Sequence, residues 1–456
     1  MSRYTSATDA DRREMLETIG VSSVEELFAD IPAHLRLQSP LALDSGLSEM
    51  EVYDELRALA ARNISTEDEV SFLGAGMYDH YVPALVDSIT SRSEFLTPYT
   101  PYQPEVSQGG LQAMFEYQTA ICELTGLPVS NASVYEGPSA VAAAGYVAKL
   151  ANARRRFIVS RGVHPHAREA LATLAHGWGM DVVEAPLHGG VTELPQLDED
   201  VSAVIVAQPN FVGAVEDLES LAAAAHGVGA LCVASCDPLP LSLLRTPGDC
   251  GVDIAVGEGQ TLGNRLDFGG PSFGFFAATE ALIRRVPGRI AGETRDVEGR
   301  RGFVLTLQTR EQHIRRERAT SNICTAQALN ALAGVIYLSW LGRRGIVELT
   351  ELILQRTAYA RQRLTALDGV HALHDQPVVR EFAVALDAPV QPVIDRCLKR
   401  GINPGYALGR DYPEHENGLL VAITERRTRA DIDRLVAVIG EAVVAERGGQ
   451  LHEVGA

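Results

Sequence analysis

The residues of this chain that could do chemistry stand where predicted strands end. The tripeptide Gln-Pro-Asn at 208–210 closes one apolar segment, and Asp237 closes the next. Open α/β sheets bind their ligands beyond the carboxyl ends of parallel strands, so we expect both ends to face one functional edge. Turn preferences favour equally a structural role, in which Asp237 caps the turn before Pro238.

A glycine-rich turn follows the third predicted strand of this region. Gly257, Gly259 and Gly263 have the spacing GxGxxxG, and a glycine-rich loop and a further strand follow them. A dinucleotide motif needs a helix there, because the helix N-terminus holds the pyrophosphate. The turn therefore does not predict NAD binding.

Histidines occur in two close pairs, His164 with His166 and His371 with His374. Neither pair has a set of carboxylates or cysteines beside it, so we predict no metal site. The first pair lies at a predicted strand-to-helix junction, where helix capping is the commoner role. The sequence also has no GxSxG elbow and no Walker motif.

Composition excludes several classes of protein. The 456 residues include 59 acidic and 40 basic ones, for a net charge of -19, which argues against nucleic-acid or anionic-membrane binding. The six cysteines form no CxxC, which fits a reducing compartment. No signal segment and no apolar run of transmembrane length is visible. We expect a cytoplasmic protein that binds neither membrane nor nucleic acid.

The elements that must position these residues fall into three predicted parts. Residues 1–72 read as a helical N-terminal arm. Residues 73–325 alternate helices with apolar strands, which indicates a mostly parallel sheet covered on both faces. We expect a long helical region around 311–368, across the boundary to the third part. Residues 326–456 form a smaller C-terminal α/β domain in this prediction.

The spacing of the strand-end residues is similar to that of pyridoxal-phosphate enzymes of the aspartate-aminotransferase fold. In those enzymes a turn like the one at Asn210 precedes an aspartate that keeps the cofactor's pyridinium nitrogen protonated. They also need a lysine after the next strand, to hold the cofactor covalently. Here that turn reads Glu-Gly-Gln-Thr (258–261), and the only lysines, Lys149 and Lys399, end predicted helices. We therefore expect this chain alone not to run Schiff-base catalysis.

Four long segments closely resemble the P-protein of the glycine cleavage system, in the form of the alpha subunit (subunit 1) of its two-chain version. They are residues 72–86, 94–137, 268–278 and 305–332. The resemblance implies an α/β aspartate-aminotransferase-like fold, that is, the PLP-dependent transferase fold type I. Gln260 stands where beta-type chains carry the cofactor lysine. Glu136 replaces an expected aspartate and Arg318 a usual lysine, both conservatively.

The resemblance also implies an activity, glycine dehydrogenase (aminomethyl-transferring). A partner beta subunit (subunit 2) would bind pyridoxal phosphate and decarboxylate glycine, and the aminomethyl group would pass to the lipoyl group of H-protein. The active site would lie at the alpha–beta interface, with two alpha–beta pairs in the complex. The resemblance therefore implies a structural role for Asp237.

A polar, proline-stiffened loop is our candidate for what this chain supplies. We expect the loop to reach into the partner's pocket, because a proline-stiffened loop that offers hydroxyl and amide donors suits substrate positioning. Packing at the subunit interface is the alternative. The candidate residues are Tyr99, Thr100, Tyr102, Gln103, Glu105, Ser107 and Gln108.

An arginine-rich segment is our candidate for docking, either to acidic H-protein or across the subunit interface. Its residues are Arg310, Arg315, Arg316 and Arg318, and helical spacing would put Arg315 and Arg318 on one face. Composition alone favours a merely solvated face. For the whole chain two further hypotheses stay open, a self-sufficient pyridoxal-phosphate enzyme with an unplaced lysine and a non-catalytic scaffold.

Overall fold

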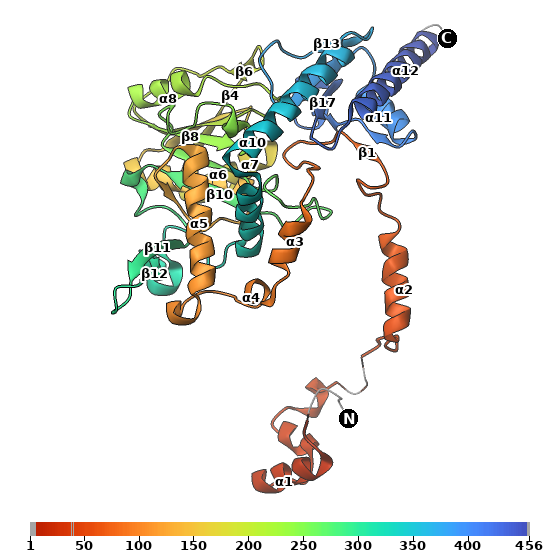
Figure 1. Cartoon of the computed structure of the whole chain (residues 1–456). Helices are drawn as coiled ribbons and strands as arrows, with labels where there is room; N and C mark the ends of the chain where they lie inside the picture. The colour runs from red at the N-terminus through yellow and green to blue at the C-terminus, as the bar shows by residue number, and fades with distance from the viewer. Residues whose placement is uncertain (1–5, 38, 40, 454–456) are drawn as a thin grey trace. The chain divides into compact units, whose positions relative to one another are not determined.

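The computed structural model of the chain describes residues 6–37, 39 and 41–453 (Figure 1). The chain separates into two units, residues 1–64 and 65–456. The helices are α1 (Asp9–Ile19), α2 (Glu49–Ala60), α3 (Ala84–Thr90), α4 (Ser93–Leu96), α5 (Gln108–Thr125), α6 (Gly137–Asn152), α7 (Pro165–Trp178), α8 (Leu218–Gly227), α9 (Gln312–Arg315), α10 (Ala328–Thr365), α11 (Val390–Leu398) and α12 (Arg429–Glu453).

The strands are short, and most of them belong to one sheet. They are β1 (Val70–Ser71), β2 (Val129–Ser130), β3 (Arg156–Ser160), β4 (Asp181–Ala185), β5 (Leu187–His188), β6 (Val191–Thr192), β7 (Val201–Gln208), β8 (Leu231–Cys236), β9 (Ile254–Glu258), β10 (Gly274–Ala278), β11 (Ile290–Arg295), β12 (Arg301–Thr306), β13 (Val370–Ala372), β14 (Glu381–Leu386), β15 (Ile402–Asn403), β16 (Tyr406–Ala407) and β17 (Gly418–Ala422).

The two α-helices of the first unit begin with capping boxes. Thr8 and Ser48 each accept a hydrogen bond from the third residue of their helix, and the acidic side chains of Asp11 and Glu51 bond back. Such reciprocal bonds satisfy amide groups that a helix start leaves free. Among the described residues of α1 and α2, none is buried.

The main sheet has the strand order β2-β10-β9-β8-β7-β3-β4. From β9 to β4 the neighbouring strands run parallel, whereas β10 is antiparallel to both β9 and β2. All eight residues of β7 are buried, because helices cover both faces of the sheet. This confirms the predicted mostly parallel α/β architecture.

Alternate residues of the central strands feed two separate cores. On one face, Val204 and Val206 pack with residues of α5, α8 and α10, such as Ile121. On the other face, Ala203 and Ile205 pack with small residues of α6 and α7. The strict alternation follows from the two-residue period of a strand. It holds the carboxyl ends of β7, β8 and β9 at one edge.

The helix α10 connects this sheet to the C-terminal part of the chain. Its first turns pack into the sheet core and its last turns, around Ala360 and Leu364, pack into a third core. Gly342 interrupts the helix with φ 63° and ψ 177°, a left-handed conformation that favours glycine. The third core lies against an antiparallel sheet of order β13-β14-β17-β16, covered by α11 and α12. Whether the chain divides functionally at 72 and 325 stays a prediction.

One predicted element is wrong in part. The expected helical region 311–368 begins only at Ala328, and the segment before it holds the four-residue α9 and a 3-10 turn at Arg316–Arg318. Arg315 has φ -143° and ψ 81°, which breaks the helix. Arg315 and Arg318 therefore do not share one helical face. Over the part of the chain that the structure describes, no helix is long and apolar enough to cross a membrane.

Candidate functional site

A cavity of about 500 Å³ lies at the carboxyl ends of the parallel strands. We call it the strand-end cavity. Pro209 and Asn210 after β7, Asp237 after β8 and Glu258 at the end of β9 line it, together with the start of α6. The parallel pairing of β7 with β8 aligns Gln208 with Cys236, so the two predicted strand ends do face one edge.

Asp237 is paired within the chain. Its carboxylate accepts from the guanidinium of Arg380, which is 3% exposed. The same guanidinium lies 3.4 Å from the centre of the Tyr78 ring, an arrangement that attracts a cation to the ring face. Arg380 also donates to Nε2 of His80 at 2.7 Å. The guanidinium of Arg380 therefore neutralises the carboxylate of Asp237 within the chain.

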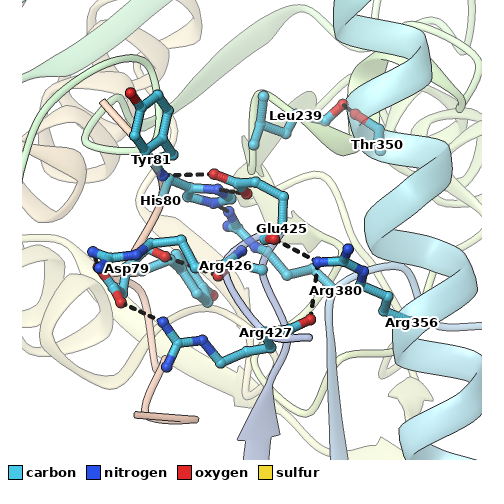
Figure 2. Close-up of polar contacts among 12 residues, drawn as sticks. Asp79, His80, Tyr81, Leu239, Thr350, Arg356, Arg380, Glu425, Arg426 and Arg427 are labelled. Atoms are coloured by element: carbon cyan, nitrogen blue, oxygen red, sulfur yellow. Dashed lines mark hydrogen bonds and ion pairs between the residues drawn. The ribbon is translucent and has the colours of Figure 1, made fainter. Parts of the chain in front are cut away.

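A polar network fixes the residues around Arg380 (Figure 2). His80 contacts Glu425 through Nδ1 at 2.7 Å, and the backbone N–H of Tyr81 donates to Glu425 at 2.6 Å. The other members join the segment before α3 to the end of β17 and to α10. Asp79 accepts from Arg426 at 2.6 Å and Arg427 at 2.9 Å, Arg356 donates to the carbonyls of Glu425 and Arg427, and Thr350 donates to the carbonyl of Leu239.

Two carboxylates occupy the N-terminus of α6. Glu136 is the N-cap and accepts from the backbone N–H of Ser139 at 2.9 Å. Glu258 accepts from the backbone N–H of Gly137 at 3.0 Å, and burial raises the pKa of this carboxyl. Free N–H groups at a helix start attract anions, and here side chains of the chain itself are the anions.

Glu381 is the most perturbed acid in the cavity wall. Its carboxylate accepts from the backbone N–H of Ala75 at 2.7 Å and from the hydroxyl of Tyr78 at 2.8 Å. Burial nevertheless raises the pKa of Glu381 to about 7. Neither Glu381 nor Arg380 was singled out from the sequence, although two charged residues directly before the apolar segment FAVAL are a visible signal.

Gln260, at the position predicted to be equivalent to a cofactor lysine, is fully buried and does not line the cavity. Its amide bonds to the backbone N–H and carbonyl of Tyr78 at 2.9 and 3.0 Å, and to the carbonyl of Asn264. Lys149 lies 5.7 Å from the Tyr146 ring centre, and Lys399 ends α11. Of the described residues that line the cavity, none is a lysine.

Pyridoxal phosphate does not fit the residues present in this cavity. A phosphate at the start of α6 would meet the carboxylates of Glu136 and Glu258, which already accept from the helix amides. Asp237, the candidate partner of a ring nitrogen, is taken by Arg380. We therefore route no chemical step of this chain through that cofactor.

The histidines behave as capping and packing residues. His164 is the N-cap of α7, accepts from the backbone N–H of His166 and contacts the carbonyl of Ala75, and burial lowers the pKa of its ring. His374 contacts the carbonyl of Val212 at 2.9 Å. Within residues 6–37, 39 and 41–453, no group of three metal-ligating side chains is present.

A second cavity, of about 310 Å³, lies beside the polar loop 99–108 and the start of α5. We call it the loop cavity. Of the seven loop residues predicted to form a site, Tyr99 and Ser107 line it, with Tyr117 and Leu329 opposite. Tyr99 is 75% exposed and accepts from the hydroxyl of Thr325 at 2.8 Å. Thr100, Tyr102, Gln103, Glu105 and Gln108 lie outside its wall.

The remaining loop residues have different surroundings. Gln108 is tied to β12, because its amide donates to the carbonyl of Phe303 at 2.8 Å and accepts from the N–H of the same residue. Gln103 and Glu105 are exposed. Thr100 has a buried hydroxyl with no hydrogen-bond partner among the residues that the structure describes.

The structure joins the loop to the arginine-rich segment, which the sequence did not suggest. The hydroxyl of Tyr102 accepts from Arg289 at 3.1 Å, and its ring lies 5.2 Å from that of His313. Arg289 also forms an ion pair with Glu311 at 3.7 Å. Arg289 and Glu311 are 4% exposed.

The four candidate docking arginines are dispersed. Arg310 is buried, where it donates to the carbonyl of Val286 and where burial lowers the pKa of its guanidinium. Arg315 and Arg316 are exposed, and neither forms an ion pair with a described residue. The side chain of Arg318 is not among those that the structure describes.

Several buried polar atoms around the loop and this segment form no hydrogen bond within the described chain, although Arg289 and Glu311 pair with each other at 3.7 Å. They belong to Thr100, Arg289, Arg310, Glu311 and Thr320. Buried polar groups are normally hydrogen-bonded, so such a concentration requires an explanation.

Comparison with known proteins gives a consistent result. A model of the family "Glycine cleavage system P-protein" matches residues 2–439. The probable glycine dehydrogenase (decarboxylating) subunit 1 of Geobacillus sp. (strain WCH70) is 48% identical over 445 residues, which cover 97% of this chain and 99% of that protein. The corresponding protein of Brevibacillus brevis is 49% identical over 440 residues, 95% and 98% of the two chains.

A solved structure agrees over the same length. A crystal structure of glycine decarboxylase (P-protein) of the glycine cleavage system, in inhibitor-bound form, superposes with a TM-score of 0.89 at 45% identity, covering 97% of this chain and all of that one. The sphingosine-1-phosphate lyase of Burkholderia pseudomallei superposes with a TM-score of 0.62 at 17% identity, over 94% and 96% of the two chains. The chain therefore has the PLP-dependent transferase fold type I.

Proposed function

This chain belongs to the glycine cleavage system P-protein family, in its subunit 1 form, and we propose that it works as the cofactor-free half of a two-chain glycine decarboxylase. Its partner is a subunit 2 chain that carries pyridoxal phosphate. Bound there, the cofactor supplies an electron sink for the carbanion that forms when glycine loses carbon dioxide. The lipoyl arm of H-protein then takes up the aminomethyl group. We place the complex in the cytoplasm.

The internal bonding of the polar groups of the strand-end cavity is the observation that supports the division of labour. Arg380 pairs with Asp237, and Glu136 and Glu258 accept from the α6 amides where a phosphate would be held. An anionic cofactor would have to displace these groups and then face two carboxylates. A chain of this fold that cannot hold the cofactor depends on a second chain for the chemistry.

The loop 99–108 is what we assign to this chain in the joint active site. Its hydroxyl and amide groups would orient the glycine carboxylate and exclude water until the lipoyl arm arrives. The hydroxyls of Thr100 and Thr320 and two guanidinium nitrogens of Arg310 are buried without a hydrogen bond in the described chain. They support this role, since a partner surface would supply the missing hydrogen bonds. Exposed Arg315 and Arg316 are the charges we assign to docking of H-protein or of the partner.

The proposal is tested by measuring glycine-dependent exchange of labelled carbon dioxide with pyridoxal phosphate and lipoylated H-protein. Three samples are assayed: the full chain alone, the full chain mixed with a candidate subunit 2, and subunit 2 alone. We expect activity only in the mixture, and a cofactor absorbance band only from subunit 2. Activity from the isolated chain would favour a self-sufficient enzyme. Equal activity of subunit 2 with and without this chain would indicate that this chain is a non-catalytic scaffold.

A further inference from the structure

Tyr102, in the loop 99–108, is held by a charged group of its own chain while much of its side chain stays exposed. Its hydroxyl accepts from the guanidinium of Arg289 at 3.1 Å, and the guanidinium carbon lies 5.4 Å from the centre of its ring. The residue is nevertheless 47% exposed. Binding residues are often carried by loops that a rigid scaffold positions, and Tyr102 has both properties.

Arg289 has little freedom to take another position. It comes directly before β11 and is 4% exposed. Its backbone carbonyl accepts from the N–H of Ala132 at 2.8 Å, and its Nε lies 3.7 Å from Oε2 of Glu311, which is also buried. The guanidinium is planar and rigid, so the terminal nitrogen that donates to Tyr102 has a direction set by the fold.

The ring of Tyr102 has a second neighbour in the same cluster. The ring of His313 lies 5.2 Å from it at an angle of 59°, and Nδ1 of His313 lies 3.7 Å from the same Oε2 of Glu311. Tilted aromatic pairs at this separation attract each other. Arg289 and His313 therefore contact Tyr102 from two segments of the chain, and Glu311 lies near both of them.

The hydroxyl of Tyr102 keeps a hydrogen to donate. A phenolic hydroxyl carries one O–H donor and can also accept. Since Arg289 donates to the oxygen, the hydrogen has to point elsewhere, and among the described residues no acceptor for it is present. Donation from a charged group also polarises the O–H bond and strengthens the hydrogen bond that it gives in turn. An anionic acceptor such as a carboxylate suits this donor.

We propose that Arg289 is a positioning residue of the joint active site, which aims the hydrogen of the Tyr102 hydroxyl at the carboxylate of the amino-acid substrate held by the partner subunit. This role rests on the proposed function, because the substrate is bound there and not on this chain. Tyr102 makes the contact, whereas Arg289 acts through it and touches no substrate. The aimed hydrogen bond holds the carboxylate in the orientation in which carbon dioxide leaves.

A double-mutant cycle on the mixed subunits tests this proposal. Exchange of labelled carbon dioxide is measured against glycine concentration for the wild type, R289M, Y102F and R289M/Y102F. We expect each single variant to lower kcat/KM for glycine about tenfold, and the double variant to stay within about twofold of Y102F. An arginine that merely supported the fold would lower kcat/KM just as far in the Y102F background. The matched control R284M, at an exposed position before β11, should keep the wild-type value.

R289M leaves Glu311 buried without its counterion, so a second variant guards against a loss of folding. R289M/E311Q removes both charges and should give the same fall in kcat/KM, with a melting temperature closer to that of the wild type. An equal effect of R289M with and without the Tyr102 hydroxyl, or an unchanged kcat/KM in R289M/E311Q, would overturn the role of Arg289 and leave the proposed function standing. An inactive wild-type mixture would overturn both.

Discussion

The polar groups around the two cavities of this chain differ in how completely they are hydrogen-bonded. In the strand-end cavity, the lining carboxylates of Glu136, Asp237 and Glu258 are bonded to other groups of the same chain. Around the loop 99–108 and the segment after β12, the hydroxyls of Thr100 and Thr320 are buried without a hydrogen-bond partner in the described chain. In the first region the polar groups are engaged within the chain, whereas we assign the unsatisfied groups of the second region to contact with a partner.

We infer from this difference where the partner subunit binds. An unsatisfied buried group costs about 1–3 kcal/mol, so several of them in one region are tolerated when a partner surface supplies the bonds. The loop 99–108 and the segment after β12 form that region together, since Tyr102 contacts Arg289 and the ring of His313. The comparison leads to four predictions.

The largest expected effect comes from removing the side chain of Arg380 from the wall of the strand-end cavity. R380A leaves Asp237 and His80 without their common partner and uncovers the Tyr78 ring. We expect the free energy of unfolding to fall by about 3–5 kcal/mol, because an inward-facing charge loses its counterion. Urea unfolding followed by circular dichroism measures this, with the exposed R344A as the control. A loss no larger than that of R344A would mean that the cavity is not held closed by Arg380.

A second test uses pH. The pKa of Glu381 is raised from 4.5 to about 7 in the fold, so the protonated carboxyl stabilises the fold below pH 4.5. That contribution, about 3 kcal/mol, is lost as the pH rises through 7. E381Q should keep it at every pH, and its unfolding free energy should therefore fall less than that of the wild type between pH 5 and 8. Parallel pH profiles for the two proteins would contradict the raised pKa.

In the loop, the double variant Y102F/Q103A should lower turnover about tenfold while the complex stays assembled. The reason is that these side chains are assigned to the partner's pocket. Because the hydroxyl of Tyr102 also accepts from buried Arg289, the melting temperature of this chain is measured as well. Exchange of labelled carbon dioxide measures turnover, and size-exclusion chromatography of the mixed subunits reports assembly. Unchanged turnover would mean that the loop serves only packing at the subunit interface.

The smallest effect is expected for the lysines. K149R and K399R keep the charge at two helix ends and should change the exchange rate of the mixed subunits by less than twofold. Loss of activity in either variant would support the self-sufficient enzyme and would break the comparison, because an active lysine would then exist outside the strand-end cavity.

Much of this molecule could be read from the order of its residues. The alternation of apolar strands with helices predicted a mostly parallel sheet covered on both faces, because period and length are local properties. The placing of 208–210 and Asp237 at one edge followed, since parallel strands align their carboxyl ends. The absence of a lysine after the third strand was equally visible.

The tertiary structure alone decided how the site is filled. Arg380 lies far along the chain from Asp237, and only the packing of the C-terminal part against the sheet brings them together. The same holds for Arg289 at Tyr102. A helix prediction over 311–327 failed for a related reason, since buried contacts around Arg310 and Glu311 outweigh local helix preference. Sequence determines the elements through local periodicity, whereas long-range pairing of charges depends on how those elements pack.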